Sequence, residues 1–440
     1  MNRIEALVSQ FTRQYGHPPR VVARAPGRVN LLGEHTDYNG LPVLPMAIDR
    51  SILVAGTLRD DRQIRLANVD SQFPPRRYAI ERTMPAFSPG DWGNYHKAAT
   101  HGLLSWLGPT ALHGGDFLVD GDIPPSAGLS SSSAFVVGSA LALLAVNERT
   151  WDPTQLADLL ASAERYVGTL SGGMDQAVCL LAQPGRALRI DFDPLRTRPV
   201  PVPSGCVFVV CNSLVAAEKS GAARAAYNRR VMECRLACHA LEQALGSALP
   251  RSLAHFGDLA RLFPDRPLTH FLALLENTLP PRPLAISEIA ELLGMSADSA
   301  AAGLGLSQAD ESPFWLLQRA RHVLSEAERV NRGEVALASG DWVAFGALMD
   351  ASHASCRDDY DVSCAELEAL VAVAKEAGAI GARVTGAGFG GCTVNLVATR
   401  DVPFFLTMVD RGYYQPRLKG SGREHCFVFT PGAGAEVVRI

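Results

Sequence analysis

A dense group of polar side chains lies near the beginning of the chain, between two segments rich in β-branched residues. The sequence APGRVNLLGEHTDYNG supplies these side chains as Arg28, Asn30, Glu34, His35, Thr36, Asp37, Tyr38 and Asn39. A ligand with many hydroxyl groups needs such a mixture, because each hydroxyl both donates and accepts a hydrogen bond. A turn rich in Asn, Asp and Gly with solvated side chains would have a similar composition. Composition alone leaves both interpretations open.

A loop of small residues precedes a long apolar segment in the sequence IPPSAGLSSSSAFVVGSALALLAV. The pattern predicts a strand end, a Gly/Ser loop and then a helix. Free N–H groups at a helix N-terminus attract phosphate, and small residues let phosphate oxygens approach the backbone. A serine hydroxyl at the start of the helix can also reach a magnesium ion. A flexible Ser-rich linker is the alternative, but an apolar helix follows at once, and the Gly-Lys-Ser/Thr of a Walker A loop is missing.

A third glycine-rich segment, VTGAGFGGCTVNLV, lies close to the C-terminus. Gly386, Gly388 and Gly391 formally satisfy the dinucleotide-binding pattern G-x-G-x-x-G. That pattern requires a helix after the glycines and a βαβ unit around them, whereas here a strand-like run follows. We therefore predict a glycine-rich turn between two strands.

Two acidic residues, Glu164 and Asp175, flank the segment RYVGTLSGGM. Phosphoryl transfer needs a carboxylate on magnesium and commonly another near the attacking hydroxyl. A surface glutamate and a helix-capping aspartate would look the same in the sequence. The sequence alone does not select these two from 45 acidic residues.

The sequence patterns around these motifs predict an α+β protein of two domains. The 440 residues are 47% hydrophobic, which is more than one ordinary core needs. Short β-branched runs dominate the first half, helix-like segments dominate residues 222–377, and a few strands return after them. We place the boundary between Pro199 and Pro203, which gives domains at 1–200 and 201–440. The second domain is closed by a small antiparallel sheet, with the site between the domains.

The bulk composition excludes several classes of protein. A formal net charge of −4 gives no basic excess of the kind that nucleic-acid or membrane-surface proteins show. The nine cysteines form no C-x-x-C pair, which argues against zinc and redox motifs and favours buried thiols. No signal peptide or membrane-spanning stretch is evident. We expect a monomeric, cytoplasmic protein with no nucleic-acid or membrane partner.

The segment GRVNLLGEHTDYNG resembles the galactokinase signature. The segments PPSAGLSSSSA, GGMDQ and TGAGFGGCT also resemble motifs of the galactokinase–homoserine–mevalonate–phosphomevalonate kinase superfamily, in the right order. The resemblance covers essentially the whole chain. It is closest to the N-acetylgalactosamine kinase branch, through ERYVGTLSGGMDQ, YNRRVMECRLA and SCRDDYDVSCAELEALV. It implies a two-domain small-molecule kinase that uses ATP and Mg²⁺ to phosphorylate the anomeric hydroxyl of galactose.

The resemblance also implies roles for individual residues. Asp175 would be the catalytic carboxylate that faces the anomeric hydroxyl, and Arg28 would stabilise the developing charge beside it. The sugar would be bound by Glu34, His35, Asp37, Gly173 and Tyr227. The phosphates of ATP would be cradled by Gly128, Leu129, Ser130, Ser131, Ser132 and Ser133. Ser132 and Glu164 would complete the magnesium shell, and Trp92 would lie near the adenine or belong to the core.

The identity of the sugar rests on opposing features. Tyr227 matches a galactokinase tyrosine where N-acetylgalactosamine kinases tend to carry phenylalanine. Gly172 and Gly173, in a short segment before Asp175, favour the alternative of an N-acetylgalactosamine kinase, because small residues would leave room at C2 of the sugar. Leu170 replaces an acidic residue of that branch. A non-catalytic galactose sensor is a further alternative, against which the intact serine loop argues, and a mevalonate or homoserine kinase would lack the sugar loop.

Overall fold

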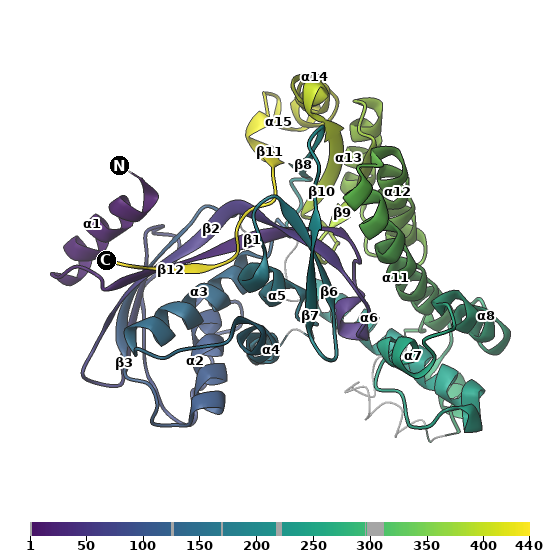
Figure 1. Ribbon diagram of the computed structural model, residues 1–440, viewed down its shortest axis with the longest axis horizontal. Coiled ribbons are helices and arrows are strands. Elements are labelled where there is room, and N and C mark those ends of the chain that lie inside the picture. Colours follow the sequence, from purple (N-terminus) through teal and green to yellow (C-terminus); the bar gives the residue numbers. More distant parts are fainter. Residues whose placement is uncertain (1, 125–126, 169, 217–221, 295, 297–311) are drawn as a thin grey trace.

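The structure is a computed structural model that describes residues 2–124, 127–168, 170–216, 222–294, 296 and 312–440. A first sheet has its strands in the order β12-β1-β2-β5-β3-β4. Their bounds are β1 (Val21–Leu32), β2 (Leu44–Leu58), β3 (Gln63–Asn68), β4 (Arg76–Ala79), β5 (Gly115–Gly121) and β12 (Glu436–Arg439). Neighbours are antiparallel except for β3 and β5. Figure 1 shows β1 and β2 running from the end that holds both chain termini to the centre of the molecule.

Helices cover the two faces of this sheet unequally. One face packs against α2 (Gly93–Leu107), α3 (Ser131–Val146), α4 (Pro153–Ala163) and α5 (Met174–Leu181), and the other carries α1 (Arg3–Tyr15) (Figure 1). Successive side chains of a strand point to opposite faces. Val21 and Val54 therefore pack with the larger helical layer, whereas Val22 and Leu53 pack with α1.

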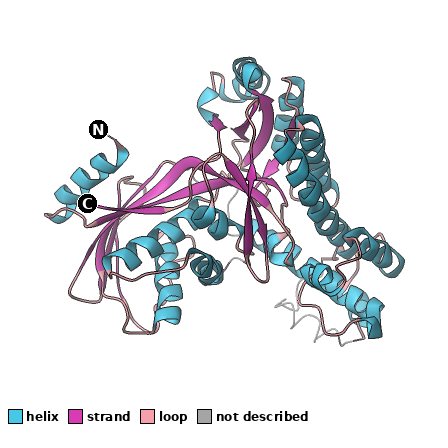
Figure 2. Ribbon diagram, in the orientation of Figure 1, coloured by secondary structure: helices cyan, strands magenta, loops and turns pink. Residues whose placement is uncertain are grey.

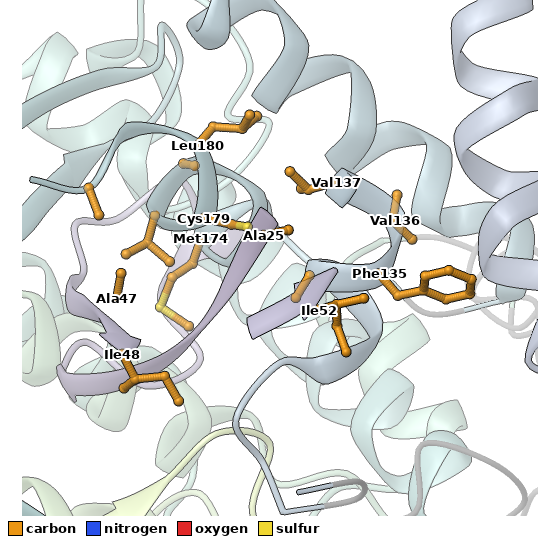
Figure 3. Packing of buried hydrophobic residues seen from close by; sticks show 14 of the residues in the cluster. Ala25, Ala47, Ile48, Ile52, Phe135, Val136, Val137, Met174, Cys179 and Leu180 are labelled. Atoms are coloured by element: carbon orange, nitrogen blue, oxygen red, sulfur yellow. The ribbon is translucent and has the colours of Figure 1, made fainter. Parts of the chain in front are cut away.

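The core under α3 and α5 fixes where these helices begin. Figure 3 shows Phe135, Val136 and Val137 of α3 near Met174, Cys179 and Leu180 of α5, with Ala25, Ala47, Ile48 and Ile52 of the sheet. Helix α3 is buried nearly all round, as expected for a helix that is apolar on every side. The first turns of both helices are consequently held in place by a packed core.

A second, smaller sheet has the order β11-β8-β10-β9 and is antiparallel throughout. Its strands are β8 (Cys206–Asn212), β9 (Gly381–Thr385), β10 (Cys392–Ala398) and β11 (Cys426–Phe429). The helices around it are α11 (Leu316–Ser339), α12 (Trp342–Asp358), α13 (Ala365–Glu376) and α14 (Val402–Val409). Figure 2 shows the long helices beside this sheet. The α+β class, with a strand-rich first half and a helix-rich second half, is confirmed.

Helices also fill the region between residues 222 and 292. They are α6 (Ala222–Leu245), α7 (Gly257–Leu262), α8 (Leu268–Thr278) and α9 (Ile286–Leu292). Part of the segment 222–377, where the sequence predicts mainly helix, lies outside the described residues, namely residues 295 and 297–311. None of the helices described here is long and apolar enough to cross a bilayer.

The chain around residue 200 differs from the sequence prediction. The predicted linker overlaps β7 (Arg196–Pro201), which pairs with β6 (Arg186–Asp191). Prolines are tolerated there because β7 is an edge strand of this two-stranded sheet, whereas β6 is also bridged to Val43 through Ile190. Strand β8 then opens the second sheet, whereas β12 returns to pair with β1. The division into domains at 1–200 and 201–440 remains a prediction. Strand β12 does not respect this division, because it belongs to residues 201–440 but pairs with β1.

Candidate active site

A cavity of about 730 Å³ opens where four segments meet. The first turns of α3 and α5, the turn after β1 and the loop after β9 all contribute to its wall. The three sequence motifs, widely separated along the chain, thus line one space together with Asp175.

Asp175 lies in the first turn of α5 and is bonded to two other segments of this wall. Its Oδ1 accepts a hydrogen bond from Nε of Arg28 at 2.8 Å, and its Oδ2 accepts one from the Ser130 hydroxyl. The side chains of Arg28 and Asp175 are 5% and 13% exposed. Arg28 also donates from Nη1 to the Gly128 carbonyl at 2.6 Å. The guanidinium therefore compensates the carboxylate and ties it to the serine loop.

The serine loop turns sharply before α3 begins. Gly128 and Ser130 both have positive φ, +75° and +59°. A Cβ at Gly128 would stand 2.9 Å from the Thr385 carbonyl oxygen, so the loop after β9 requires glycine there. Gly128, Ser130, Ser131 and Ser132 line the cavity. The predicted residues Leu129 and Ser133 instead face the interior, where the Leu129 carbonyl accepts a hydrogen bond from the Arg28 N–H at 3.1 Å.

The turn after β1 presents Glu34, His35 and Asp37 to the same cavity. Glu34 accepts a hydrogen bond from Nη2 of Arg383 at 2.9 Å. Burial raises the pKa of Glu34 to about 7, although Arg383 and Arg28 oppose the shift. Burial holds the pKa of His35 well below its ordinary value, so the ring is neutral. Burial and the nearby Asp175 carboxylate raise the pKa of Asp37.

Two further predicted sugar contacts complete this wall. The Tyr227 ring lies 5.5 Å from the His35 ring and 5.6 Å from the Tyr38 ring, between centroids. Gly173 precedes α5 with φ of +127°, a conformation that favours glycine. Met174 donates its N–H to Asp37 at 3.4 Å, which joins the turn to the start of α5.

Comparison with known proteins accounts for this arrangement. Residues 9–58 match the family described as the galactokinase galactose-binding signature, and residues 94–183 and 334–404 match the N-terminal and C-terminal domains of GHMP kinases. The chain is 36% identical over 444 residues to the galactokinase of Chloroflexus aurantiacus, which covers 100% of this chain and 98% of that protein. The chain belongs to the galactokinase family. Its identity to the galactokinase of Dictyostelium discoideum is 34%, over 99% of this chain and 94% of that protein.

Solved structures agree with this family. A crystal structure of Lactococcus lactis galactokinase complexed with galactose superposes with a TM-score of 0.78 at 28% identity, over 99% of this chain and 100% of that chain. The mevalonate kinase of Methanococcus jannaschii has a TM-score of 0.59 at 16% identity, over 94% and 99% of the two chains, and shares the fold. The protein is thus a phosphotransferase of this family, with a hydroxyl group as the acceptor.

A second part of the cavity is aromatic. The Trp92 ring stacks on Phe135 with centroids 5.7 Å apart and meets Phe73 edge-on at 5.9 Å. Its indole N–H donates to the Pro74 carbonyl at 2.9 Å. Trp92 is only 9% exposed, so it belongs to the hydrophobic core. It also lines the cavity, where part of its ring is available to a ligand.

The residues around Glu164 suit a divalent cation that is bound together with phosphates. Glu164 is 2% exposed, and the Ser133 hydroxyl lies 3.1 Å from both of its carboxylate oxygens. Carboxylate and hydroxyl oxygens are the ligands Mg²⁺ takes, with substrate phosphates and water completing its shell. Within the described residues no cluster of His, Cys, Asp and Glu forms a ready-made metal cage. The serine that contacts Glu164 is Ser133, one residue beyond the predicted Ser132, and Nε2 of Gln176 also donates to the Glu164 carboxylate. Ser132 lines the cavity, whereas Glu164 and Ser133 are not among the described residues that line it.

Apart from Tyr227, sequence reasoning missed the residues in the second half of the chain that hold the turn after β1. Arg383 of β9 is fully buried and holds Glu34. The Tyr360 hydroxyl lies 2.8 Å from the Tyr38 hydroxyl, which in turn lies 3.0 Å from Nδ1 of His35. An arginine inside the strand-like run ARVTG was the available signal, because a charge in a buried strand needs a partner.

The two glycines before Asp175 lie in different surroundings. A Cβ at Gly172 would stand 2.3 Å from the Tyr38 backbone nitrogen, so this glycine permits close packing against the turn after β1. Gly173 lines the cavity, and a Cβ there would stand 3.1 Å from Cβ of Ala161. The expected room at C2 of the sugar stays a prediction.

Proposed function

We propose that this galactokinase-family protein transfers the γ-phosphoryl group of ATP to the anomeric hydroxyl of galactose, giving ADP and galactose 1-phosphate. The observation that carries the proposal is the position of the Asp175 carboxylate, which is held by Arg28 and Ser130. It lies where the turn after β1, residues 33–39 (the sugar turn), meets residues 128–133 (the serine loop). The galactokinase names of relatives that span the whole chain support it, as does the galactose in the similar Lactococcus lactis structure.

Asp175 is proposed to orient the anomeric hydroxyl and to accept its proton as the hydroxyl oxygen attacks phosphorus. Arg28 pairs with this carboxylate and stabilises the charge that develops beside it. In a loose transition state the attacking oxygen is only weakly bonded, so orientation is the larger part of what the carboxylate contributes.

The phosphates of ATP are proposed to lie at the first turn of α3. Gly128, Ser130, Ser131 and Ser132 line the cavity there, and helix N-termini favour anions. Glu164 and Ser132, with Ser133 beside Glu164, would hold a magnesium ion, which supplies neutralisation of the phosphate charge. The aromatic surface of Trp92 would take the adenine.

Glu34, His35, Asp37, Gly173 and Tyr227 are proposed to surround the sugar. Neutral His35 can donate and accept hydrogen bonds, and the carboxylates accept them, which suits hydroxyl groups. The full-length relatives are galactokinases and residues 9–58 match a galactose-binding signature, which supports galactose as the preferred substrate.

An ADP-release assay with a panel of sugars tests this function. Purified protein with ATP and Mg²⁺ should release ADP with galactose, at a kcat/KM at least about tenfold higher than with N-acetylgalactosamine, and EDTA should abolish the release. A galactose sensor would bind the sugar without releasing ADP. Faster turnover of N-acetylgalactosamine would make that sugar the substrate.

We further propose that the protein works as a monomer in a reducing cytoplasm. Seven of its nine cysteines are buried, and all nine are free thiols. Light scattering after size exclusion would give the mass of one 47.1 kDa chain, and a mass twice as large would contradict the monomer.

A further inference from the structure

The turn that carries Glu34 and His35 has an unusual backbone conformation. Gly33 has φ of +92° and His35 has φ of +62°. A non-glycine residue in this left-handed region persists only where its surroundings hold it there. The groups that hold this turn therefore decide how Glu34 and His35 face the cavity.

Two side chains of α11, one helical turn apart, contact the backbone of this turn from behind. Oε1 of Glu326 accepts hydrogen bonds from the N–H of Gly33 at 2.8 Å and from the N–H of Glu34 at 3.4 Å. Nε2 of His322 lies 3.0 Å from the Glu34 carbonyl oxygen. The spacing of four residues places both side chains on the same face of the helix. Neither residue lines the cavity, so both act on the turn and leave the sugar untouched.

The surroundings of Glu326 keep it an acceptor. The side chain is fully buried, and burial opposes ionisation, but the Arg329 and Arg383 guanidinium groups hold its pKa below the ordinary range. Nε of Arg329 donates to Oε2 at 2.5 Å, and the Ser352 hydroxyl donates to Oε1 at 2.6 Å. Both carboxylate oxygens are therefore occupied by donors, and a group that carries its own N–H would not fit this place.

His322 is held as a hydrogen-bond donor. Burial lowers its pKa to about 4, so the ring is neutral at physiological pH. Its Nε2 faces a carbonyl oxygen and must carry the proton, while Nδ1 lies 3.0 Å from the Ser355 hydroxyl. Helix α11 thus binds both the N–H and the C=O of Glu34.

We propose that Glu326, with His322, is a positioning residue that sets the affinity for the sugar by holding the backbone of Gly33 and Glu34. The inference rests on the proposed function, because it takes this turn to bind galactose. The contacts reach the sugar turn and not the serine loop, so the effect is confined to the sugar.

Glu326→Gln tests the proposal with a side chain of the same size. Whichever way the amide lies, its NH₂ meets a donor, either Arg329 or the N–H groups of the turn. The loss of a hydrogen bond to a charged group of this kind changes an equilibrium constant by about 10- to 100-fold. We expect Kd and KM for galactose to rise by about that factor and KM for ATP to change less than about twofold.

Asp410→Asn is the matched control. Asp410 is 4% exposed and accepts hydrogen bonds from the Gly422 N–H at 2.7 Å and from Nε2 of Gln415 at 2.8 Å. None of these groups lines the cavity. This variant should leave the constants for both substrates unchanged. The inference would be overturned if Glu326→Gln raised KM equally for galactose and ATP, or if it left KM for galactose unchanged. It would also be overturned if Asp410→Asn raised KM for galactose and left KM for ATP unchanged.

Galactose binding by calorimetry separates this inference from the proposed function, because binding needs no turnover. A wild type that binds galactose without turning it over refutes the kinase, while the ratio of Kd values still decides the role of Glu326. A wild type that does not bind galactose refutes both proposals. If Glu326→Gln does not fold, His322→Leu should weaken galactose binding and His322→Gln, whose amide can donate to the Glu34 carbonyl, should restore it; equal binding by these two variants would overturn the proposal.

Discussion

Replacing Asp175 by asparagine removes one charge and one proton acceptor while keeping the size of the side chain. The carboxylate accepts hydrogen bonds from Nε of Arg28 at 2.8 Å and from Ser130. Arg28 keeps the Gly128 carbonyl as a partner at 2.6 Å, so the guanidinium stays in place. The variant therefore isolates what the carboxylate contributes to the reaction.

The magnitude follows from the two roles of the carboxylate. A positioned general base contributes about 10²- to 10⁴-fold, and a tenfold change corresponds to about 1.4 kcal/mol of barrier. We expect kcat to fall by about 10³-fold, or about 4 kcal/mol. Because the ion pair is only 5% and 13% exposed, the unpaired Arg28 should also lower the free energy of unfolding by about 3 kcal/mol.

The assay combines ADP release with calorimetric binding of galactose. The Kd for galactose should change less than about fivefold, since the sugar turn keeps its contacts. Asp91→Asn is the control, because Asp91 pairs with Arg76 at 2.6 Å and lines the same cavity. Its kcat should stay within tenfold of the wild type. A kcat for Asp175→Asn within tenfold of the wild type would refute the role of this carboxylate.

Three further changes probe other parts of the site. Gly172→Ala places a Cβ 2.3 Å from the Tyr38 nitrogen, so KM for galactose should rise and Tm should fall in kinetic and melting measurements; unchanged values would contradict this packing. Burial raises the pKa of Glu34 from 4.5 to about 7, so its contribution to stability is full below about pH 4.5 and is lost as pH rises through 7. The Tm of the wild type relative to Glu34→Gln should accordingly fall between about pH 5 and 8, and a constant difference would contradict the shift. Trp92→Ala should raise KM for ATP and leave KM for galactose unchanged, while lowering stability by about 3 kcal/mol; a raised KM for galactose alone would place the adenine elsewhere.

Elements with a strong local pattern could be predicted from the sequence. The apolar run after Ser132 gives α3, and the short β-branched runs in residues 20–25 and 51–59 give parts of β1 and β2. Strand β12 was missed because four residues at the C-terminus gain their conformation only by pairing with β1. Strand β7 was missed because its prolines are typical of linkers, and only the hairpin with β6 makes them acceptable.

The residues of the candidate site also divide into those that a local pattern could predict and those that depend on distant partners. Asp175, Arg28 and the serine loop could be placed through the family resemblance, since each lies within a short motif. Arg383 and Glu326 lie in segments that look structural, and their roles depend on a contact with a turn some 300 residues away in the chain. Local periodicity carries no information about such partners.

The product of the reaction tests the central claim most directly. Galactose, ATP and Mg²⁺ are incubated with the protein, and the product is examined by phosphorus and proton NMR. We predict a sugar phosphate whose phosphorus couples to the anomeric proton, formed by the wild type and at about 10³-fold lower rate by Asp175→Asn. Phosphate on any other hydroxyl, or ATP consumption without a sugar phosphate, would contradict anomeric phosphorylation by this site.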